Sequence, residues 1–275
     1  IGREDLFVLF SCQLKYINRM KIQMKKWKLL LGTALVSVAL LGCAKTNQPS
    51  SPEAAKNAQT VTIGYTQFPA NIDPADEYNG WFTVRYGVGE TLFKMDDQLV
   101  PQPWLAEKIE QTSQLEWKIT LRNDVTFQNG EKMTGAKVEA SLKRLIEKSK
   151  RAAADLGVES IQSDGQTVTI KTKSEQPIMK NLLAEPYSVI VDVDGKAASD
   201  KAPVGTGPFL IKTYTPETGA SLEAYENYWG GKAKVAQVQI KYFSDPTAIS
   251  AALQSKEVDA VYGLPYANLA NFKKN

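Results

Sequence analysis

Residues 238–262, VQIKYFSDPTAISAALQSKEVDAVY, carry the clearest structural signal in the chain. At their start, apolar and polar residues alternate up to Tyr242, which predicts a half-buried strand. Asp245-Pro246 is typical of an N-cap followed by proline in the first helical turn, and the apolar stripe behind it predicts a helix. Residues 258–262 predict a second strand. A strand, a helix and a strand with short joints predict a βαβ unit, so we expect a parallel pair of strands.

Upstream segments show the same two periodicities. Alternation predicts strands at 60–65 and 115–121, and Asp164-Gly165 predicts the turn of a hairpin between two further short apolar runs. Thr134 is placed to cap a helix whose apolar stripe runs from Val138 to Ile146. The block of about 90–185 is therefore rich in strands, with one or two helices, and behaves like a small domain. Together with the βαβ unit it predicts an α/β protein.

The segment from Gln67 to Gly80 contains several turn-forming residues and predicts a loop. This loop leads into Trp81 and Phe82, and aromatic side chains on a loop are well suited to form the wall of a ligand site. We therefore expect the stretch from Tyr78 to Tyr86 to be a loop that faces a ligand.

The N-terminal segment has the layout of a secretory signal. A lysine-rich start after Met24 is followed by an apolar run that is shorter than the roughly 20 residues of a membrane-spanning helix. The run ends in Leu-Leu-Gly-Cys43, which resembles the lipobox of bacterial lipoproteins, and we expect Cys43 to be lipidated and to anchor the protein. The alternative is an ordinary signal peptide followed by a thiol without a role. Residues before Met24 are interpreted as an upstream segment, with Met20 as a second candidate start.

Charge and composition exclude several classes of function. The chain has 33 Lys and Arg and 30 Asp and Glu residues, but seven of the former and two of the latter lie in residues 1–42, so 26 basic side chains face 28 acidic ones in the rest. This balance gives no case for nucleic-acid binding. The two cysteines, Cys12 and Cys43, exclude a disulfide framework, and the absence of histidine excludes histidine-based catalysis and zinc sites within the chain. We therefore expect no catalytic residue, no metal site and no cofactor.

Six segments form a pattern along the chain. The strongest are GTGPF at 205–209, YWGG at 228–231 and the segment 244–262, and earlier ones are GETLF at 89–93, PWLA at 103–106 and LRNDVTFQNG at 121–130. In order and spacing they resemble the motifs of the solute-binding proteins of peptide and nickel ABC importers, and the resemblance covers about residues 60–265. Each piece by itself also fits a turn or a packing role, and the two glycines of 205–209 fit a tight turn better than a phosphate cradle because no Lys-Ser or Lys-Thr follows.

The resemblance implies a bilobal fold like that of periplasmic binding proteins, truncated here. We expect the following division: an upstream segment at 1–23, a lipoprotein signal peptide at 24–42, a flexible tether at 43–59, a discontinuous first lobe at 60–90 and 186–262, an inserted small α+β domain at 91–185, and the start of a missing second lobe at 263–275. An isolated chain of this extent is expected to hold ligand less tightly than the intact protein, because closure of two lobes buries a ligand on both sides.

The resemblance also implies two ligand classes, oligopeptides first and nickel or metallophore chelates as the alternative. In chelate binders an arginine typically holds carboxylates of the chelator, and Arg151 falls near that position. The alternative is that Arg151 is a solvated cation at the end of a helix and has no role in binding. The ligand-binding residues expected from this comparison and from the aromatic stretch are Tyr78, Trp81, Phe82, Arg85 and Arg151.

The expected protein is thus not an enzyme but a lipid-anchored binding protein on the extracytoplasmic side of the cell membrane. Its expected partners are a peptide or metal-chelate ligand and the permease subunits of an ABC importer, and we expect a monomer at full length. A surface hydrolase or adhesin on the same tether is the alternative of another class. It would need a convergent set of catalytic side chains, which the sequence does not display.

Overall fold

The computed structural model describes residues 60–76, 78–194 and 202–272. The predictions for the upstream segment, the signal peptide, Cys43 and the tether lie outside these residues. Among the described residues, no helix combines the length and the apolar character needed to span a membrane.

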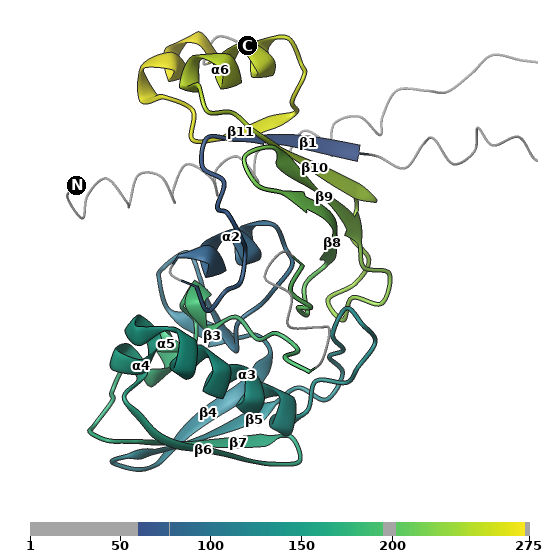
Figure 1. The fold of residues 1–275 in the computed structure, drawn as a ribbon. Helices are drawn as coiled ribbons and strands as arrows, with labels where there is room; N and C mark the ends of the chain where they lie inside the picture. The colour runs from purple at the N-terminus through teal and green to yellow at the C-terminus, as the bar shows by residue number, and fades with distance from the viewer. Residues whose placement is uncertain (1–59, 77, 195–201, 273–275) are drawn as a thin grey trace, which may run out of the picture. The chain divides into compact units, whose positions relative to one another are not determined.

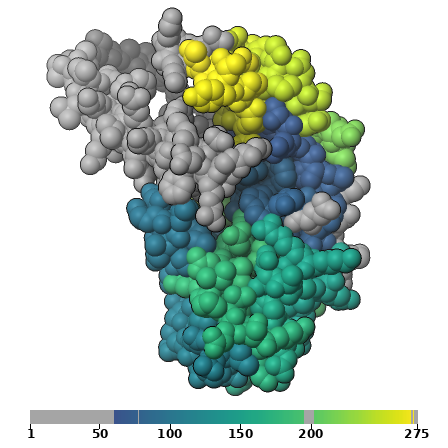
Figure 2. Space-filling model, turned by 90° about the vertical axis from the view of Figure 1, so that its left-hand side faces the viewer, coloured from purple at the N-terminus to yellow at the C-terminus, as the bar shows by residue number. Residues whose placement is uncertain are grey.

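A five-stranded mixed sheet contains the first and the last strand of the described chain (Figure 1). Its order is β11 (Ala260–Tyr262), β1 (Thr60–Tyr65), β10 (Gln237–Tyr242), β9 (Gly219–Ala224) and β8 (Phe209–Thr215). β1 is parallel to both β10 and β11, whereas β9 runs antiparallel to β10 and to β8. The yellow residues after α6 accordingly adjoin the blue segment that contains β1 in Figure 2.

The predicted βαβ unit is confirmed, with one correction. α6 (Pro246–Gln254) joins β10 to β11, and the Asp245 side chain caps it by accepting from the Thr247 amide at 2.7 Å. The two strands are parallel in direction, but they are not neighbours as expected, because β1 lies between them and pairs with both. The crossover determines the direction of the second strand. The strand between them, β1, comes from a distant part of the sequence, so no local pattern predicts its position.

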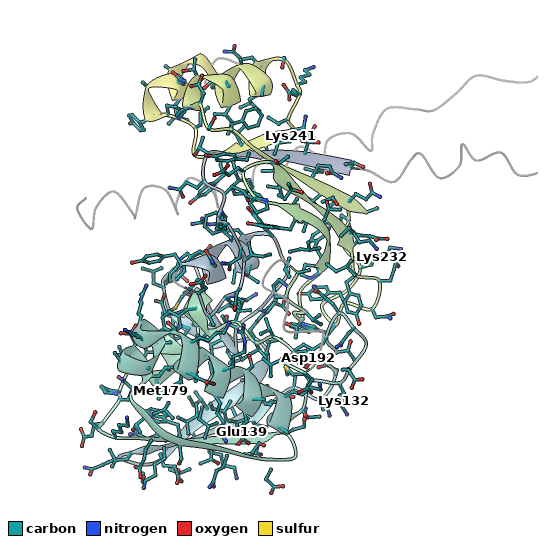
Figure 3. The ribbon with its side chains drawn as sticks, in the orientation of Figure 1. Lys132, Glu139, Met179, Asp192, Lys232 and Lys241 are labelled. Atoms are coloured by element: carbon teal, nitrogen blue, oxygen red, sulfur yellow. The ribbon has the colours of Figure 1, made fainter. Side chains whose placement is uncertain are left out.

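A four-stranded antiparallel sheet forms from the middle of the chain. Its order is β4 (Ala106–Ser113), β5 (Glu116–Leu121), β7 (Thr167–Thr172) and β6 (Val158–Asp164). α3 (Gly135–Lys148) and α4 (Lys150–Leu156) complete this part, and the predicted Thr134 cap is confirmed by its hydrogen bond from the Lys137 amide. The predicted hairpin is confirmed as β6 and β7. Glu139 on α3 accepts from the Ser163 hydroxyl on β6 at 2.6 Å, which ties the helix to the sheet (Figure 3).

The prediction of a loop from Tyr78 to Tyr86 is wrong, because α2 (Asn79–Arg85) occupies this stretch. Asn79-Gly80 indicated a turn, but Gly80 serves close packing instead. A Cβ atom on Gly80 would lie 2.2 Å from the carbonyl oxygen of Pro186, so only glycine lets the helix approach that backbone. The remaining short elements are β2 (Phe93–Met95), β3 (Pro101–Pro103), α5 (Met179–Leu182) and 3₁₀ turns at Pro186–Ser188 and Tyr266–Phe272.

The buried carboxylate of Glu90 joins four segments that are far apart in the sequence. It is 8% exposed and accepts from the indole of Trp104 at 3.0 Å and the hydroxyl of Thr206 at 2.8 Å. It also accepts from the hydroxyl of Tyr228 at 2.6 Å and the indole of Trp229 at 2.9 Å. A buried acceptor with four donors is fully satisfied, so it orients all four side chains together.

Gln128 makes a second junction beside the first. Its side-chain amide donates to the carbonyl oxygens of Val88, Gly207 and Phe209, at 3.0, 3.0 and 2.6 Å. The backbone of 205–207 runs so close to residues 87 and 88 that a Cβ atom on Gly205 would lie 2.0 Å from the Val88 oxygen. The glycines of this motif therefore allow two backbone segments to touch, and they do so without left-handed backbone angles.

Glu90→Gln is expected to destabilise the protein by roughly 3 kcal/mol, because an amide oxygen cannot accept four hydrogen bonds and buried donors are left unpaired. Urea unfolding of the two proteins at pH 7 measures the difference. Glu226→Gln is the matched control, since this carboxylate is exposed and paired with the exposed Lys232, and we expect a change below about 0.5 kcal/mol. Equal losses in the two variants would contradict the role given to Glu90.

Candidate ligand-binding site

One side of α2 carries four of the five residues predicted to bind ligand. Tyr78 is the residue before the first turn, and Trp81, Phe82 and Arg85 follow at spacings of three and four. Residues at these spacings share one side of a helix, so the four side chains form a single stripe. Tyr78 is 63% exposed, which is unusual for a large aromatic residue, and Trp81 and Phe82 are half-buried.

Arg151 meets this stripe from the first turn of α4. Its guanidinium carbon lies 5.6 Å from the ring centroid of Tyr78, 5.4 Å from Trp81 and 5.3 Å from Tyr187. These distances are within the range of cation–π attraction. Three of the predicted residues are thus brought together, and the structure adds Tyr187, which the sequence analysis missed. We call these four residues the Arg151 cluster.

Arg151 is not a freely solvated cation at a helix end. Its side chain is 46% exposed, and its Nε donates to the Asp155 carboxylate at 3.4 Å, one helical turn away. Glu185 is also close: burial raises the pKa of its carboxyl, the positive charge of Arg151 opposes that rise, and Asp155 reinforces it. The rings contact the guanidinium without accepting hydrogen bonds from it, and the hydrogen bond to Asp155 uses only its Nε.

Arg85 lies at the other end of the stripe, against the parallel strands. Its guanidinium carbon is 4.4 Å from the ring centroid of Tyr262 and 5.6 Å from that of Phe82. The structure therefore places Arg85 and Phe82 together, in contact with the end of β11. We call Arg85, Phe82 and Tyr262 the Arg85 cluster.

A row of tyrosines marks the carboxyl ends of the three parallel strands. Tyr65 ends β1, and it is in register with Tyr242 at the end of β10 and with Tyr262 at the end of β11. The rings of Tyr65 and Tyr262 are 5.4 Å apart. Burial raises the pKa of Tyr65 to about 12, so its hydroxyl is neutral at physiological pH. Open α/β sheets bind ligands just beyond the carboxyl ends of their strands, and the row lies at that edge.

The residues missed by sequence reasoning left only a partial signal. Tyr242 and Tyr262 each end a predicted strand. Because the two strands are expected to be parallel, the sequence indicates that both tyrosines lie at the same edge of the sheet. Their register with Tyr65 and the contact of Tyr187 with Arg151 depend on pairings between distant segments.

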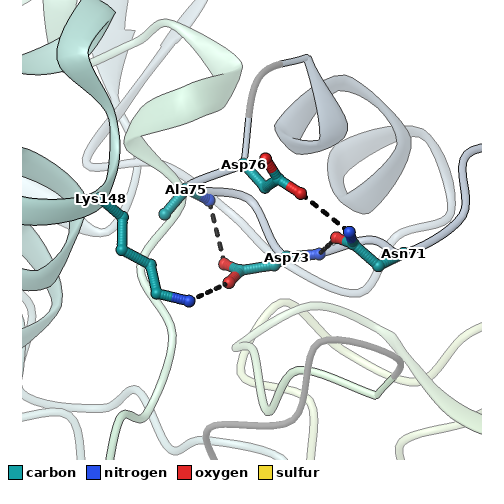
Figure 4. A pocket seen from close by; sticks show the side chains of 5 residues that line it. All are labelled: Asn71, Asp73, Ala75, Asp76 and Lys148. Atoms are coloured by element: carbon teal, nitrogen blue, oxygen red, sulfur yellow. Dashed lines mark hydrogen bonds and ion pairs between the residues drawn. The ribbon is translucent and has the colours of Figure 1, made fainter.

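Behind α2, a cavity of about 330 Å³ is lined by Asn71, Asp73, Ala75, Asp76 and Lys148 (Figure 4). Asp73 is 3% exposed and accepts from the Ala75 amide at 3.1 Å and from Lys148 at 3.1 Å, in addition to a bidentate pair with Arg144. Burial by itself would raise the pKa of Asp73, but the Arg144, Ala75 and Lys148 hydrogen bonds hold it below the ordinary 3.8. This pair fixes the loop before α2 to α3, and so it positions the stripe. Among the described residues, no group of three or more acidic, histidine or cysteine side chains is placed to hold a metal ion.

Residues 100–275 match the profile of the bacterial extracellular solute-binding proteins, family 5, in its middle region. The chain belongs to this family. The nickel-binding protein NikA of Staphylococcus aureus is 34% identical over 192 residues, which are 70% of this chain and 39% of that protein. The glutathione-binding protein GsiB of Escherichia coli is 26% identical over 249 residues, which are 86% of this chain and 48% of that protein.

A crystal structure of NikA from Staphylococcus aureus in complex with Ni(L-His)2 superposes with a TM-score of 0.75. It is 31% identical and covers 78% of this chain and 46% of that one. The α/β fold expected from the sequence and the resemblance to the peptide and nickel class are therefore confirmed. The chain spans about half the length of the family members it matches.

Asp73→Asn is expected to cost about 3 kcal/mol of stability at pH 7, because it leaves Arg144 without its buried partner. The carboxyl is held below its ordinary pKa of 3.8, so its contribution is present above that value and is lost as the pH falls through the lower pKa of the folded protein. The gap between the variant and the parent protein should therefore shrink at the acid end, as measured by urea unfolding between pH 7 and pH 2.5.

Asp76→Asn is the control for this experiment, since Asp76 lines the same cavity but is exposed, and its carboxylate accepts a hydrogen bond from the Asn71 side chain (Figure 4). It should change stability by less than about 0.5 kcal/mol. A gap for Asp73→Asn that stays constant over the whole pH range would refute the ion-pair explanation.

Proposed function

We propose that the protein to which this chain belongs is the substrate-binding component of an ABC importer that captures a small anionic ligand outside the cytoplasm. The observation that carries the proposal is the Arg151 cluster, in which a half-exposed guanidinium is held by two rings of the α2 stripe, Tyr78 and Trp81, and by the buried ring of Tyr187. Aromatic walls with a few polar anchors are the usual composition of a small-molecule site. Family membership and the named relatives support the same function.

Oligopeptides and nickel or metallophore chelates are the two ligand classes within this proposal. The relatives include proteins named for nickel and for glutathione, a peptide, so both classes have support. The chain contains no histidine, so a nickel ion at these residues would be held by the donor atoms of its chelator. The side chains of α2 and Arg151 would then bind the organic part of the complex, which is also how they would bind a peptide.

We propose further that the protein acts by binding alone and is not an enzyme. A tethered hydrolase or adhesin remains the alternative of another class. Incubation of the full-length protein with a bound peptide separates the two, since a binding protein returns the peptide intact and a hydrolase consumes it in proportion to its concentration.

The location and the division of the chain also belong to this proposal. Cys43 would carry the lipid that holds the protein at the extracytoplasmic face of the membrane, after a signal peptide at 24–42 and a tether at 43–59. Residues 60–90 and 186–262 would form the first lobe, with 91–185 as the inserted domain and 263–275 as the start of the second lobe. A full-length monomer would deliver ligand to the permease subunits.

Arg151→Gln in the full-length protein is expected to weaken binding of nickel-histidine complexes or of an acidic peptide at least tenfold, about 1.4 kcal/mol. The reason is the loss of a charge-assisted, two-pronged hydrogen bond to a carboxylate. Titration calorimetry measures the change. Lys150→Gln is the matched control, because this neighbouring cation is exposed and lies outside the ring cluster. Equal affinity in the Arg151 variant and the parent protein, for every ligand that binds, would remove Arg151 from the site.

Cys43→Ala is expected to abolish lipidation and to release the protein from the membrane, since the thiol is the proposed attachment point of the lipid. Metabolic labelling with palmitate, followed by separation of membrane and soluble fractions, tests this. Ser50→Ala, in the proposed tether, serves as the control and should leave labelling unchanged. Continued labelling of the Cys43 variant would show that the anchor lies elsewhere.

A further inference from the structure

We propose that Arg85 is a second anion anchor of the same site, so that the protein prefers ligands with two separated anionic groups over ligands with one. This inference rests on the proposed function and specifies the chemical class of its ligand. It arises from the position of Arg85 and from the way in which the other arginines of the described chain are used.

Of the four arginines in the described residues, Arg85 alone has no carboxylate partner. Arg122 makes a two-pronged pair with Asp124, and Arg144 makes one with the buried Asp73. Arg151 contacts Asp155 at 3.4 Å. A guanidinium has five donors and cannot be deprotonated in a protein, so an exposed guanidinium without a counter-ion is the group best prepared to receive an anion.

The rings around Arg85 hold it without using its hydrogen-bond donors. The guanidinium carbon lies over the rings of Phe82 and Tyr262, so its attraction is to ring faces, while the N–H groups lie in the plane of the guanidinium. Tyr65 and Tyr86 are the other groups whose charge interacts with it, and burial raises the pKa of both hydroxyls, so neither supplies a negative charge at neutral pH. The hydroxyl of Tyr86 is buried and has no hydrogen-bond partner among the described residues, an unpaired polar group next to the same cation.

The two anchors meet the same stripe, Arg85 from α2 itself and Arg151 from α4. Arg151 contacts the stripe at Tyr78 and Trp81, and Arg85 forms its other end. Tyr78, just before α2, and Arg85, its last residue, are seven positions apart, which is about 10 Å along the helix axis. A ligand with one carboxylate can pair with only one of the two guanidinium groups, whereas a ligand with two separated anionic groups can pair with both. The aromatic side chains of Trp81 and Phe82 between the anchors would pack against the part of the ligand that joins its charges.

The test compares dicarboxylates with monocarboxylates of the same chain length. The full-length protein is titrated with adipate, suberate and sebacate, and with hexanoate, octanoate and decanoate. We expect at least one dicarboxylate to bind tenfold or more tightly than its partner monocarboxylate, and Arg85→Gln to remove that preference. Arg85→Lys, which keeps the charge but not the fork of donors, should keep part of it. Lys171→Gln, an exposed cation paired with Glu159 on the antiparallel sheet, is the control and should change nothing.

The outcomes separate this inference from the proposed function. Equal affinities for the two acids at every length, no binding of any acid, or a preference that survives Arg85→Gln would each overturn the second anchor. The proposed function is tested by the nickel-histidine and peptide titrations of the Arg151 variant. If Arg151→Gln lowers the affinity and Arg85→Gln has no effect, the proposed function is supported and the second anchor is refuted. Circular dichroism of both arginine variants confirms that a loss of binding is not a loss of fold.

Discussion

The carboxylate of Glu90 is the junction on which this part of the molecule depends. It accepts four hydrogen bonds from side chains of Trp104, Thr206, Tyr228 and Trp229, which come from three separate stretches of sequence. A buried carboxylate is costly unless its lone pairs are matched, and here each donor is itself an aromatic or hydroxyl group whose burial requires an acceptor. The group and its donors therefore stabilise one another: removing the carboxylate leaves all four donors without this acceptor, and removing one donor leaves one lone pair of the carboxylate unmatched. Short sequence motifs that look independent along the chain are thus parts of one hydrogen-bonded unit.

This junction places the α2 stripe. Glu90 follows α2 by a few residues, and the backbone between them is held by Gln128 and by the close approach of the 205–207 segment. On the other side, the Thr83 hydroxyl donates to the Ile72 carbonyl at 2.8 Å, and Asp73 is paired with Arg144 on α3. A short helix of seven residues is marginal in isolation, so its position is set by these contacts and not by its own propensity. Because the helix is held at both ends, its exposed side can present aromatic and cationic side chains in fixed positions.

The charged side chains fall into two groups, those that stabilise the fold and those that we propose to bind ligand. The buried Asp192, labelled in Figure 3, is matched by Asn129 at 2.7 Å and by Lys137 at 3.0 Å. Arg144 and Lys148 are likewise used to satisfy Asp73. Arg85 and Arg151 differ from these cations, because aromatic rings surround both guanidinium groups and neither is paired with a buried carboxylate. Arg144, Lys148 and Lys137 satisfy buried carboxylates, whereas rings leave hydrogen-bonding capacity on the two arginines that we propose to bind ligand.

Local patterns in the sequence were enough to predict most elements of the fold. Alternation predicted β1, β5 and β10, the Asp245-Pro246 cap predicted α6, and Asp164-Gly165 predicted the β6–β7 hairpin. Each of these elements is determined by residues that are close together in the sequence. Tertiary contacts decided the rest. β1 lies between β10 and β11, which no alternation can encode. Gly80 belongs to a helix, where it allows the close approach of the Pro186 backbone, and not to the turn that Asn79-Gly80 suggests. The candidate ligand-binding residues were named from sequence, but their division into the Arg151 and Arg85 clusters appears only when α4 and β11 are folded against α2, since interactions between distant segments carry no local periodicity.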